Sequence, residues 1–538
     1  MATASEPPST AAPADLAWGA FSDNPPWVLD RDRITWRKGL DRLRAAATAE
    51  VPSLVTPRRR PPGLRVVTVA GRLIAAVGGW AIRKRLGRIP PGQSRADISR
   101  RLRVAATELG PTYIKLGQII SSGEGLFPAE LVAEFKLCRD QVPAESWDVV
   151  RTVVTEELGQ PIERVFAEFD RTPLAAASIA LVHAAQLKSG ERVVVKVQRP
   201  QVNALVHKDI AAMAWLAPHL VGRIPIAALA NPPALVELFT ETIVEELDFR
   251  LEAENMLDVA GTLAELGQRG YVVPRPHPEL VTRRMLVMER LSGFSFDDVA
   301  GMHDAGIDTE AVIRTGMIAF MEGAMIHGIF HGDLHGGNLF VMRDGRTALL
   351  DFGIIGRLSE PRRVAFLRLM LGATTNDPIT QLAALRDLGA LPADTDLAQV
   401  VKDLRLDQAP VDPTTLSAEE LVGEVQRIVK ALLGYGAHMP KELMLYVKNL
   451  VFLDGAIARL APDLDLLGEI TNISLYFMKH HGERFARELG IDAQAVDLDL
   501  GGVKAGLGVD VSTERLTYRD LQARRELIGK RMAKARKR

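Results

Sequence analysis

Residues 331–353 read HGDLHGGNLFVMRDGRTALLDFG and carry the strongest functional signal in the chain. Asn338 follows Asp333 after four intervening residues, and Asp351 opens an Asp-Phe-Gly triplet after an apolar run. In-line phosphoryl transfer needs a carboxylate near the acceptor oxygen, and an amide oxygen and a second carboxylate that hold magnesium on the phosphates. We therefore predict a catalytic role for Asp333 and metal-binding roles for Asn338 and Asp351.

One alternative is a binuclear-metal phosphatase, because Gly332 to Gly336 resemble the GDxHG box in which Asp and His bind metal. That family also carries a GDxxDR box and a GNHE box further along the chain. Neither is present, whereas the loop and the Asp-Phe-Gly triplet occur together at the spacing of a kinase catalytic loop and its metal-binding aspartate. The spacing therefore favours phosphoryl transfer of the kinase type.

The chain has 538 residues, of which 47% are hydrophobic, and its net charge is −1. This length suffices for two or more domains with packed cores. A nearly neutral chain gives no general reason to expect a nucleic-acid partner, so any basic surface has to be local. The single cysteine, Cys138, excludes an internal disulfide and fits a reducing compartment.

The N-terminal segment lacks the basic and apolar regions of a secretory signal, so we expect a cytoplasmic protein. The most apolar window, Leu64 to Ile82, is interrupted by Arg65 and Arg72 and is followed by three basic residues. We expect it to be too short and too charged to cross a bilayer, and to form a buried helix of the fold. An amphipathic helix lying on a membrane face is the alternative.

Composition and periodicity divide the chain into five expected parts. These are a disordered N-terminus (1–30), a helical N-terminal extension (31–150), an N-terminal lobe with strands (151–291), a helical C-terminal lobe (292–488) and a basic tail (489–538). Within the extension, breaks at Gly110-Pro111 and before Pro128 predict three helices. The segment before Phe169 is expected to be a connection without a strand.

The middle helix of these three carries the sequence Lys115-Leu-Gly117-Gln118. Lys115 and Gln118 lie three positions apart and therefore share a helix face, while Gly117 leaves room for a close approach. Alone, such a pair is more often a solvated surface than a functional site. Lys115 and Gln118 become candidate gating residues only through the family resemblance that the complete set of motifs carries.

Two runs rich in β-branched residues surround a Ser-Gly turn and predict a hairpin of residues 179–187 and 192–197. The second run contains Lys196 in a pattern like the kinase V-A-I-K strand, whose lysine contacts the α- and β-phosphates. An alanine-rich loop precedes the hairpin where a kinase has a glycine-rich loop. Its predicted nucleotide-binding residues are Ala175, Ala176, Ala177 and Ser178.

The next helical region contains an acidic cluster, in which Glu252 is placed to pair with Lys196 as a kinase αC glutamate does. Glu246 and Asp248 belong to the same cluster, and only the family resemblance makes them candidate partners of Lys115. Residues 271–274 and 285–289 are expected to form a strand pair that leads to an adenine-binding hinge. The hinge residues are Met288, Glu289 and Leu291.

With these motifs in this order, residues 95 to 470 resemble the UbiB (AarF/UbiB/ADCK) family of atypical protein-kinase-like proteins. The resemblance implies an α+β, two-lobed, protein-kinase-like fold that is mostly helical, with a helical KxGQ extension over the place where a protein substrate would dock. In that family Lys115 would face Glu246 and Asp248. The chain departs from the family pattern at Leu181, at Gly336 and in the absence of a C-terminal transmembrane pair, so we expect no permanent membrane anchor.

The resemblance implies ATP and Mg²⁺ as cofactors and a role in quinone or other isoprenoid lipid metabolism. The expected activity is that of an atypical kinase or ATPase. The alternative is a nucleotide-binding scaffold or lipid chaperone with little phosphoryl transfer. The expected partners are the nucleotide and no nucleic acid; an isoprenoid or quinone lipid, an anionic surface at the inner face of a membrane and a second copy of the chain are left open.

Overall fold

The computed structural model describes most of the chain between residues 20 and 535. The described residues are 20–23, 25–30, 34–57, 59–90, 92–121, 127–137, 144–220, 232–375, 377–406, 427, 431–432, 434–437, 439–491, 500–501, 504, 509–510 and 512–535. Cys138 and most of the expected disordered N-terminus lie outside them, as does the smaller part of the basic tail.

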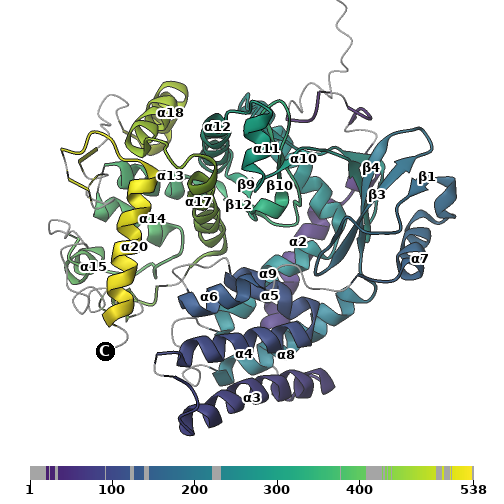
Figure 1. Ribbon diagram of the computed structural model, residues 1–538, viewed down its shortest axis with the longest axis horizontal. Coiled ribbons are helices and arrows are strands. Elements are labelled where there is room, and N and C mark those ends of the chain that lie inside the picture. The colour runs from purple at the N-terminus through teal and green to yellow at the C-terminus, as the bar shows by residue number, and fades with distance from the viewer. Residues whose placement is uncertain are drawn as a thin grey trace, which may run out of the picture. The chain divides into compact units, whose positions relative to one another are not determined.

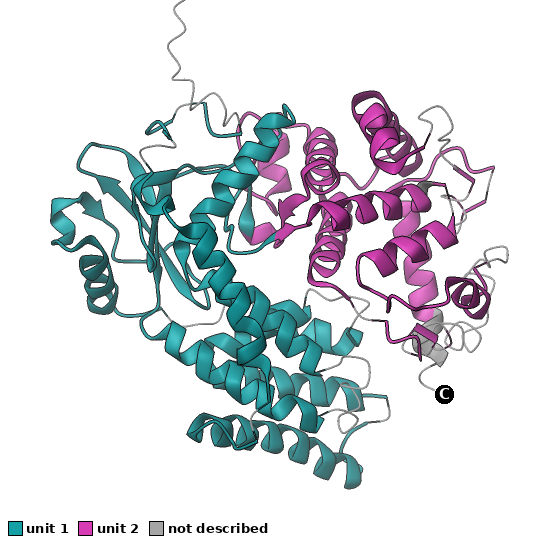
Figure 2. Cartoon of the chain, turned by 180° about the vertical axis from the view of Figure 1, so that it is seen from behind, with its two compact units in different colours: residues 1–293, 338–340, 348–355 teal, residues 294–337, 341–347, 356–538 magenta. Residues whose placement is uncertain are grey.

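The chain divides into two compact units (Figure 2). Unit 1 contains residues 1–293, 338–340 and 348–355, and unit 2 contains residues 294–337, 341–347 and 356–538. The secondary structure is α+β and mostly helical, as the sequence predicts. Asn338 and Asp351 belong to unit 1, although they follow the expected boundary at residue 292.

The main sheet of unit 1 has the strand order β1-β3-β4-β7-β6, with β2 paired to β3. Figure 1 labels β1, β3 and β4 of this sheet. Its strands are β1 (Phe166–Phe169), β2 (Ala175–Ala176), β3 (Ala180–Leu187), β4 (Arg192–Gln198), β6 (Pro276–Val281) and β7 (Met285–Glu289). β3 and β4 form the predicted antiparallel hairpin. Side chains alternate along β4, so Val193, Val195 and Val197 enter a core shared with α7 (Trp147–Leu158), and Lys196 faces the opposite side.

Two sequence predictions about this sheet are wrong. The segment before Phe169 was expected to be a connection, but Phe166–Phe169 forms β1 against β3. Residues 271–274 and 285–289 were expected to pair with each other. Instead β7 pairs with β4 and β6, and β5 (Tyr271–Val272) lies in another sheet beside β11 (Thr347–Leu349), because Pro276 starts a separate strand between them.

Unit 1 also contains a bundle of helices, five from the N-terminal extension and two that follow β4 (Figure 1). The helices are α2 (Leu40–Val55), α3 (Leu64–Arg85), α4 (Ser94–Leu109), α5 (Pro111–Ser121), α6 (Ala129–Lys136), α8 (Val202–Leu220) and α9 (Pro232–Glu246). α4, α5 and α6 are the three predicted helices. Gly110, whose φ is +106°, separates α4 from α5 at the predicted break.

The apolar window from Leu64 to Ile82 lies in α3, and both expectations for it were wrong: that it is too short and too charged to cross a bilayer, and that it forms a buried helix. This helix has 22 residues, which gives a length of about 33 Å and is enough to cross a bilayer. Only 17% of its most apolar window is buried in the structure, so α3 is not a buried core helix. By length and composition, α3 is the one helix among the described residues that could cross a membrane.

The chain turns sharply between α9 and α10 (Phe249–Glu265), so the last residue of α9, Glu246, is followed within a few residues by the first turn of α10. Asp248 caps α10 by accepting a hydrogen bond from the amide of Arg250. β10 (Leu339–Val341) and β11 are neighbours in a small sheet. Asn338 directly precedes β10, and Asp351 follows shortly after β11.

Unit 2 is largely helical around an aromatic core of Phe320, Phe330, Phe366 and Tyr446. Its helices are α11 (Val299–Asp304), α12 (Thr309–Glu322), α13 (Glu360–Thr374), α14 (Pro378–Asp387), α15 (Leu397–Leu404), α17 (Lys441–Leu460), α18 (Leu466–Leu489) and α20 (Tyr518–Ala535). Its short strands are β8 (Phe294–Ser295), β9 (Ile329–His331) and β12 (Ile355–Arg357).

Part of the expected basic tail is an ordered element of unit 2. Tyr518 and Leu521 of α20 are buried, and the hydroxyl of Tyr518 donates to Asp454 of α17 at 2.7 Å. Arg525 forms an ion pair with the same aspartate. α20 is therefore attached to α17 through its first two turns.

Candidate functional site

A buried lysine between two carboxylates forms the centre of the candidate site in unit 1. The Lys196 ammonium lies 2.7 Å and 2.9 Å from the two carboxylate oxygens of Glu252 and 3.1 Å from Oδ1 of Asp351. Lys196 and Glu252 are only 5% and 3% exposed. The structure thus brings together three predicted site residues from β4, α10 and the segment after β11.

The charges in this cluster control one another. Burial acts against the charged ammonium, but the carboxylates of Asp351 and Glu252 outweigh it and raise the pKa of Lys196. Burial also has the largest effect on Glu252 and raises the pKa of its carboxyl to about 7. Lys196 therefore stays protonated at neutral pH.

Helix α10 also holds the Asp-Phe-Gly triplet in place. The amide of Phe352 lies 3.3 Å from Oε1 of Glu252 and donates to it, while the side-chain amide of Asn255 donates to the Phe352 carbonyl at 2.9 Å. Glu252 and Asn255 are three positions apart and share one face of α10. The same helix face therefore orients both Lys196 and the backbone that carries Asp351.

Asn338 and Asp351 lie at adjacent ends of the β10–β11 hairpin. The amide of Leu350, the residue before Asp351, donates to the Asn338 carbonyl at 2.8 Å. Asp351 has a φ of +58°, which is a left-handed conformation that Asp and Asn tolerate better than most residues. Its side chain is 42% exposed and can be reached by a ligand. A carboxylate and an amide oxygen are hard donors, which fit Mg²⁺.

Lys115 of the extension reaches the same region from α5. Its ammonium lies 2.9 Å from Oε1 of Glu246, as an ion pair without the alignment of a good hydrogen bond. Both residues are buried, and burial raises the pKa of Glu246 although Lys115 opposes the shift. A Cβ added to Gly353 would lie 3.3 Å from Cγ of Glu246. Glu246 therefore lies between the KxGQ helix and the Asp-Phe-Gly triplet.

Gly117 of the same motif has a packing role. A Cβ added there would lie 2.4 Å from Cδ1 of Phe135 in α6, so no larger side chain fits without movement. Phe135 is itself 5% exposed. Gln118 follows Gly117 and is half-buried. The small residue thus lets α5, which also carries Lys115, approach α6 closely.

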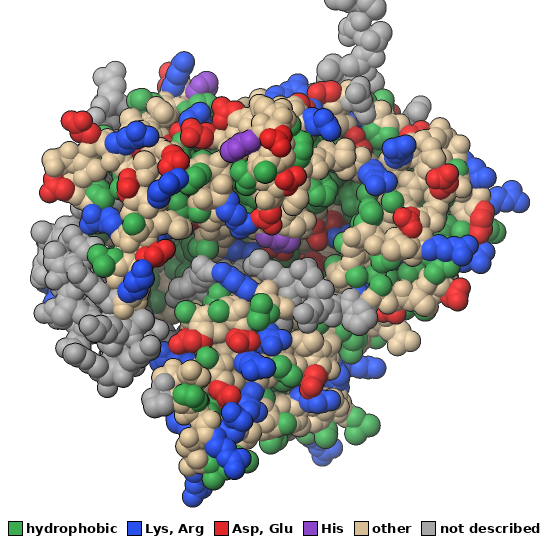
Figure 3. All heavy atoms as spheres, in the orientation of Figure 1, with side chains coloured by type: hydrophobic (Ala, Val, Ile, Leu, Met, Phe, Trp, Pro, Cys, Tyr) green, Lys and Arg blue, Asp and Glu red, His purple; other side chains and the backbone are tan. Residues whose placement is uncertain are grey.

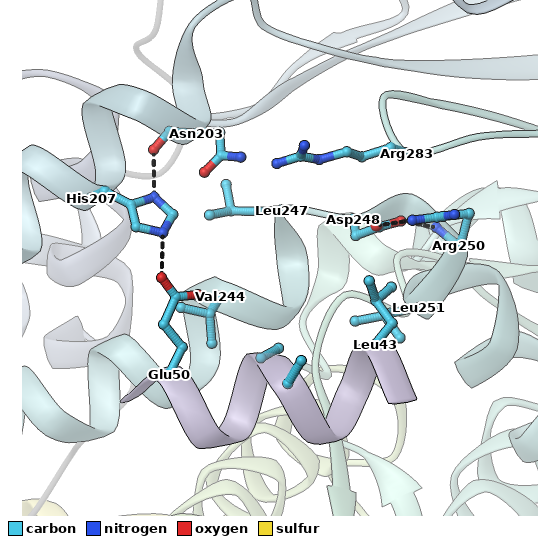
Figure 4. Close-up of a pocket in the computed structure, with 12 residues that line it drawn as sticks. Leu43, Glu50, Asn203, His207, Val244, Leu247, Asp248, Arg250, Leu251 and Arg283 are labelled. Atoms are coloured by element: carbon cyan, nitrogen blue, oxygen red, sulfur yellow. Dashed lines mark hydrogen bonds and ion pairs between the residues drawn. The ribbon is translucent and has the colours of Figure 1, made fainter. Parts of the chain in front are cut away.

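Asp248 is placed differently from Glu246. Its carboxylate receives two hydrogen bonds from the Arg250 guanidinium, at 3.0 and 2.7 Å, in addition to capping α10. Asp248 and Arg250 line a cavity of about 340 Å³ in unit 1, together with Leu43, His207 and Arg283 (Figure 4). Through its hydrogen bonds to Arg250, Asp248 stabilises the first turn of α10, the helix that carries Glu252.

The alanine-rich loop is fastened to the rest of unit 1. The Ala177 amide donates to the Ala180 carbonyl at 2.9 Å, and Nε of Arg199 donates to the Ala177 carbonyl at 3.1 Å. Arg199 also pairs with Glu145 at 3.0 Å. Ala175 and Ala176 form β2, and Ser178 is buried. The Ala177 amide is already used within the loop, unlike the amides of a flexible phosphate-binding loop.

The predicted hinge lies at the end of β7. Met288 pairs with Val194 of β4, and the Glu289 amide donates to the Arg275 carbonyl at 2.9 Å. The carboxylate of Glu289 accepts hydrogen bonds from Ser22 and from the Arg275 amide. Glu289 is thus engaged in internal contacts, and Leu291, beyond the strand, is half-buried.

In unit 2, the loop that carries Asp333 is fixed by α17. The Lys448 ammonium pairs with Oδ1 of Asp333. Asn449 accepts from the Leu334 amide at 3.0 Å and donates to the His331 carbonyl. The sequence does not indicate these three contacts, because Lys448 and Asn449 stand in an ordinary helical segment far from the loop.

The fold and these motifs define the chain as an atypical protein-kinase-like protein. The model of the ABC1 atypical kinase-like domain matches residues 137–382. An uncharacterized protein of Mycobacterium tuberculosis is 34% identical over 422 residues, covering 76% of this chain and 86% of the relative.

Two relatives with kinase names are also similar. A chloroplastic aarF domain-containing protein kinase of Arabidopsis thaliana, itself uncharacterized, is 33% identical and covers 73% of this chain and 76% of the relative. A probable protein kinase UbiB of Aliivibrio fischeri is 31% identical, and the match covers 69% of this chain and 68% of the relative. The chain belongs to the ABC1/UbiB family of atypical kinases, as the sequence motifs predict.

Proposed function

We propose that the chain is an ATP- and Mg²⁺-dependent atypical kinase or ATPase. The observation that carries this proposal is the contact of one buried lysine, Lys196, with both Glu252 and Asp351 in unit 1. A lysine held in this way can bind the α- and β-phosphates of a nucleotide, and the paired glutamate keeps its side chain extended.

Asn338 and Asp351 are the proposed magnesium ligands. Bound Mg²⁺ would neutralise phosphate charge and align the transferred group. The left-handed backbone at Asp351 and the hydrogen bond from the Leu350 amide to Asn338 hold the two donors at adjacent ends of one hairpin. Gly353 also donates its amide to Oδ1 of Asp351, which restricts the rotation of that carboxylate.

Asp333 is the proposed residue that orients the acceptor hydroxyl or water. A carboxylate in this role must present one oxygen in a fixed direction. Lys448 holds Oδ1, and Asn449 holds the backbone on both sides of the aspartate. We assign Lys448 and Asn449 as positioning residues for Asp333.

The nucleotide would be covered by Ala175–Ser178 and would meet the hinge at Met288, Glu289 and Leu291. The KxGQ helix, with Lys115, Gln118, Glu246 and Asp248, is proposed to gate the site against bulky peptide acceptors. The support for gating is that Lys115 contacts the carboxylate that lies against Gly353. A small or lipid-like acceptor is therefore favoured over a protein.

The family resemblance implies a role in quinone or other isoprenoid lipid metabolism, and we propose that role for this chain. We propose a cytoplasmic location with peripheral binding at the inner face of a membrane. The alternative is a nucleotide-binding scaffold or lipid chaperone that turns over little ATP. The internal hydrogen bond of the alanine-rich loop favours this alternative, because a fastened loop leaves fewer amides for the phosphates.

The test is steady-state phosphate release by the purified chain with Mg-ATP, with and without anionic vesicles and a short-chain quinone head-group analogue. Asp333→Asn should lower release by about a hundredfold or more while Mg-ATP still raises the melting temperature. Asp344→Asn, an exposed aspartate in the β10–β11 turn, is the matched control. Nucleotide binding without release under every condition would support the scaffold instead.

A further inference from the structure

Helix α3 presents an apolar face outward, opposite to the arrangement expected for a helix at a protein surface in water. Leu64, Val67, Ile74 and Ile82 are 86%, 66%, 70% and 61% exposed. Helical spacing places them on one side together with Gly71, Ala75, Gly78 and Ala81, so this face is uncharged along most of the helix. Single exposed apolar residues are ordinary, but a continuous stripe marks an interaction surface.

Strong positive charge surrounds this stripe. Residues 58–107 contain thirteen Lys and Arg residues and one acidic residue, whereas the whole chain has a net charge of −1. Five of the arginines form ion pairs with neighbouring carboxylates. Within the described part of the chain, no ion pair is found for seven exposed basic residues: Arg59, Arg60, Lys84, Arg85, Arg88, Arg95 and Arg100. Figure 3 shows Lys and Arg side chains gathered around α3 and α4 at the lower edge.

The other face of α3 is fixed to unit 1. Val66, Val69 and Ala76 are buried. Nε of Arg65 lies 2.5 Å from Oδ1 of Asp209 in α8, and Arg72 lies 2.6 Å from Glu108 in α4. If α3 crossed a bilayer, these arginines would lose their partners and enter the hydrocarbon. The contacts therefore favour a helix that lies in the plane of a membrane surface.

We propose that the outer face of α3, with the basic residues around it, binds an anionic lipid bilayer. The apolar stripe would enter the boundary between head groups and acyl chains, and the unpaired basic side chains would meet lipid phosphates. A nucleic acid fits less well, because the centre of the surface is aliphatic and offers neither charge nor aromatic rings. The location of this surface rests on the peripheral membrane binding proposed above.

The experiment is flotation of the full chain with phosphatidylcholine vesicles, with and without phosphatidylglycerol. The parent should float only with the anionic vesicles, and increasing salt should weaken the binding. Ile74→Glu/Ile82→Glu should lower the bound-to-free ratio by about tenfold or more, because it places charge on the inserted face. Ile379→Glu, at a residue 57% exposed on α14, is the matched control and should float like the parent.

Arg85→Gln/Arg88→Gln should lower the ratio of vesicle-bound to free protein by about fivefold for each charge removed. Lys479→Gln/Arg487→Gln on α18 is the control for charge loss. Equal flotation of the parent and Ile74→Glu/Ile82→Glu would overturn the proposal. The proposal would also be overturned if the parent formed a dimer without vesicles and Ile74→Glu/Ile82→Glu dissociated that dimer. Displacement of the vesicles by RNA would overturn it as well.

Nucleotide chemistry is measured separately from this binding. Asp333→Asn should float like the parent, and Ile74→Glu/Ile82→Glu should keep the parent's thermal shift with Mg-ATP. If Ile74→Glu/Ile82→Glu loses flotation but keeps the thermal shift, the result supports the proposed membrane-binding surface on α3, whatever the rate of phosphate release. A lack of phosphate release with normal flotation would count against the proposed activity alone.

Discussion

The Lys115 ammonium lies 2.9 Å from the Glu246 carboxylate in the interior of unit 1. Removing one partner of a buried ion pair costs about 3 to 5 kcal/mol, because the other charge stays buried without compensation. We therefore expect Lys115→Ala to lower the free energy of unfolding by this amount in chemical denaturation. Lys208→Ala, at an exposed lysine of α8, should change it by less than about 0.5 kcal/mol.

A double-mutant cycle with Glu246→Gln isolates the pair. The coupling free energy should be about 1 to 3 kcal/mol. Coupling near zero would show that Lys115 behaves as a surface lysine, and the proposed gating role would lose its support.

Gly117→Ala should destabilise the protein although alanine is the better helix former. The added Cβ would lie 2.4 Å from the ring of Phe135, so the ring or the helix must move. We expect a loss of about 1 to 3 kcal/mol in unfolding free energy. Phe135→Leu in the Gly117→Ala background should recover part of it, and a stabilising Gly117→Ala would contradict the packing described for α5 and α6.

Asp351→Asn and Asp351→Ala should separate the ligand role of the side chain from its backbone conformation. Both should reduce the increase in melting temperature caused by Mg-ATP, because the carboxylate is lost. Without ligand, Asp351→Ala should cost about 1 kcal/mol more than Asp351→Asn, since alanine tolerates the φ of +58° poorly. A parent-like shift for Asp351→Asn would remove Asp351 from the nucleotide site.

His183 should make stability depend on acid pH. It is 1% exposed, its Nδ1 lies 2.9 Å from the Asp170 carbonyl, and its Nε2 is buried with no partner among the described residues. Burial therefore lowers the pKa of His183. A lowered pKa means that its contribution to stability is complete above the ordinary histidine pKa and is lost as pH falls through the folded-state value.

Urea unfolding between about pH 8 and pH 5 checks this prediction. The parent should lose more stability on acidification than His183→Gln does. His219→Gln, at an exposed histidine of α8, should follow the parent. Identical acid dependence in His183→Gln and the parent would assign the effect to other groups.

Lys448→Met should slow phosphate release about tenfold to a hundredfold, because Asp333 would lose the partner that fixes its orientation. Nucleotide binding should be unaffected, since Lys448 is not a proposed ligand contact. The thermal shift with Mg-ATP separates the two effects, and Lys402→Met on α15 serves as the control. A normal rate of release would show that Asp333 needs no such support.

The sequence predicted the elements whose signals are local. The β-branched runs around Ser189-Gly190 gave β3 and β4, and the Gly110-Pro111 break separated α4 from α5. β1 and β6 were not predicted because short strands are stabilised by their neighbours in the sheet, which the local sequence does not reveal. The exposure of α3 was missed for a similar reason, since composition does not show which face of an apolar helix is covered.

The site also contains residues that a sequence motif predicts and residues that only the packing of the chain brings in. Lys196, Glu252 and Asp351 belong to ordered motifs, so their association could be expected from the resemblance. Lys448 and Asn449 carry no motif, and only the packing of α17 against the loop brings them to Asp333. Asp248 belongs to a motif as well, but its additional role as the cap of α10, through its bonds to Arg250, appears only in the structure.

The two carboxylates around Lys196 have a consequence for selectivity among anions. Lys196 carries one positive charge and is already matched by Glu252 and Asp351 before any ligand arrives. A polyphosphate that approaches alone would meet a surplus of negative charge, whereas one that brings a divalent cation supplies the counter-charge that Asp351 needs. The cluster should therefore discriminate against metal-free nucleotides, so that cation and nucleotide enter as a complex.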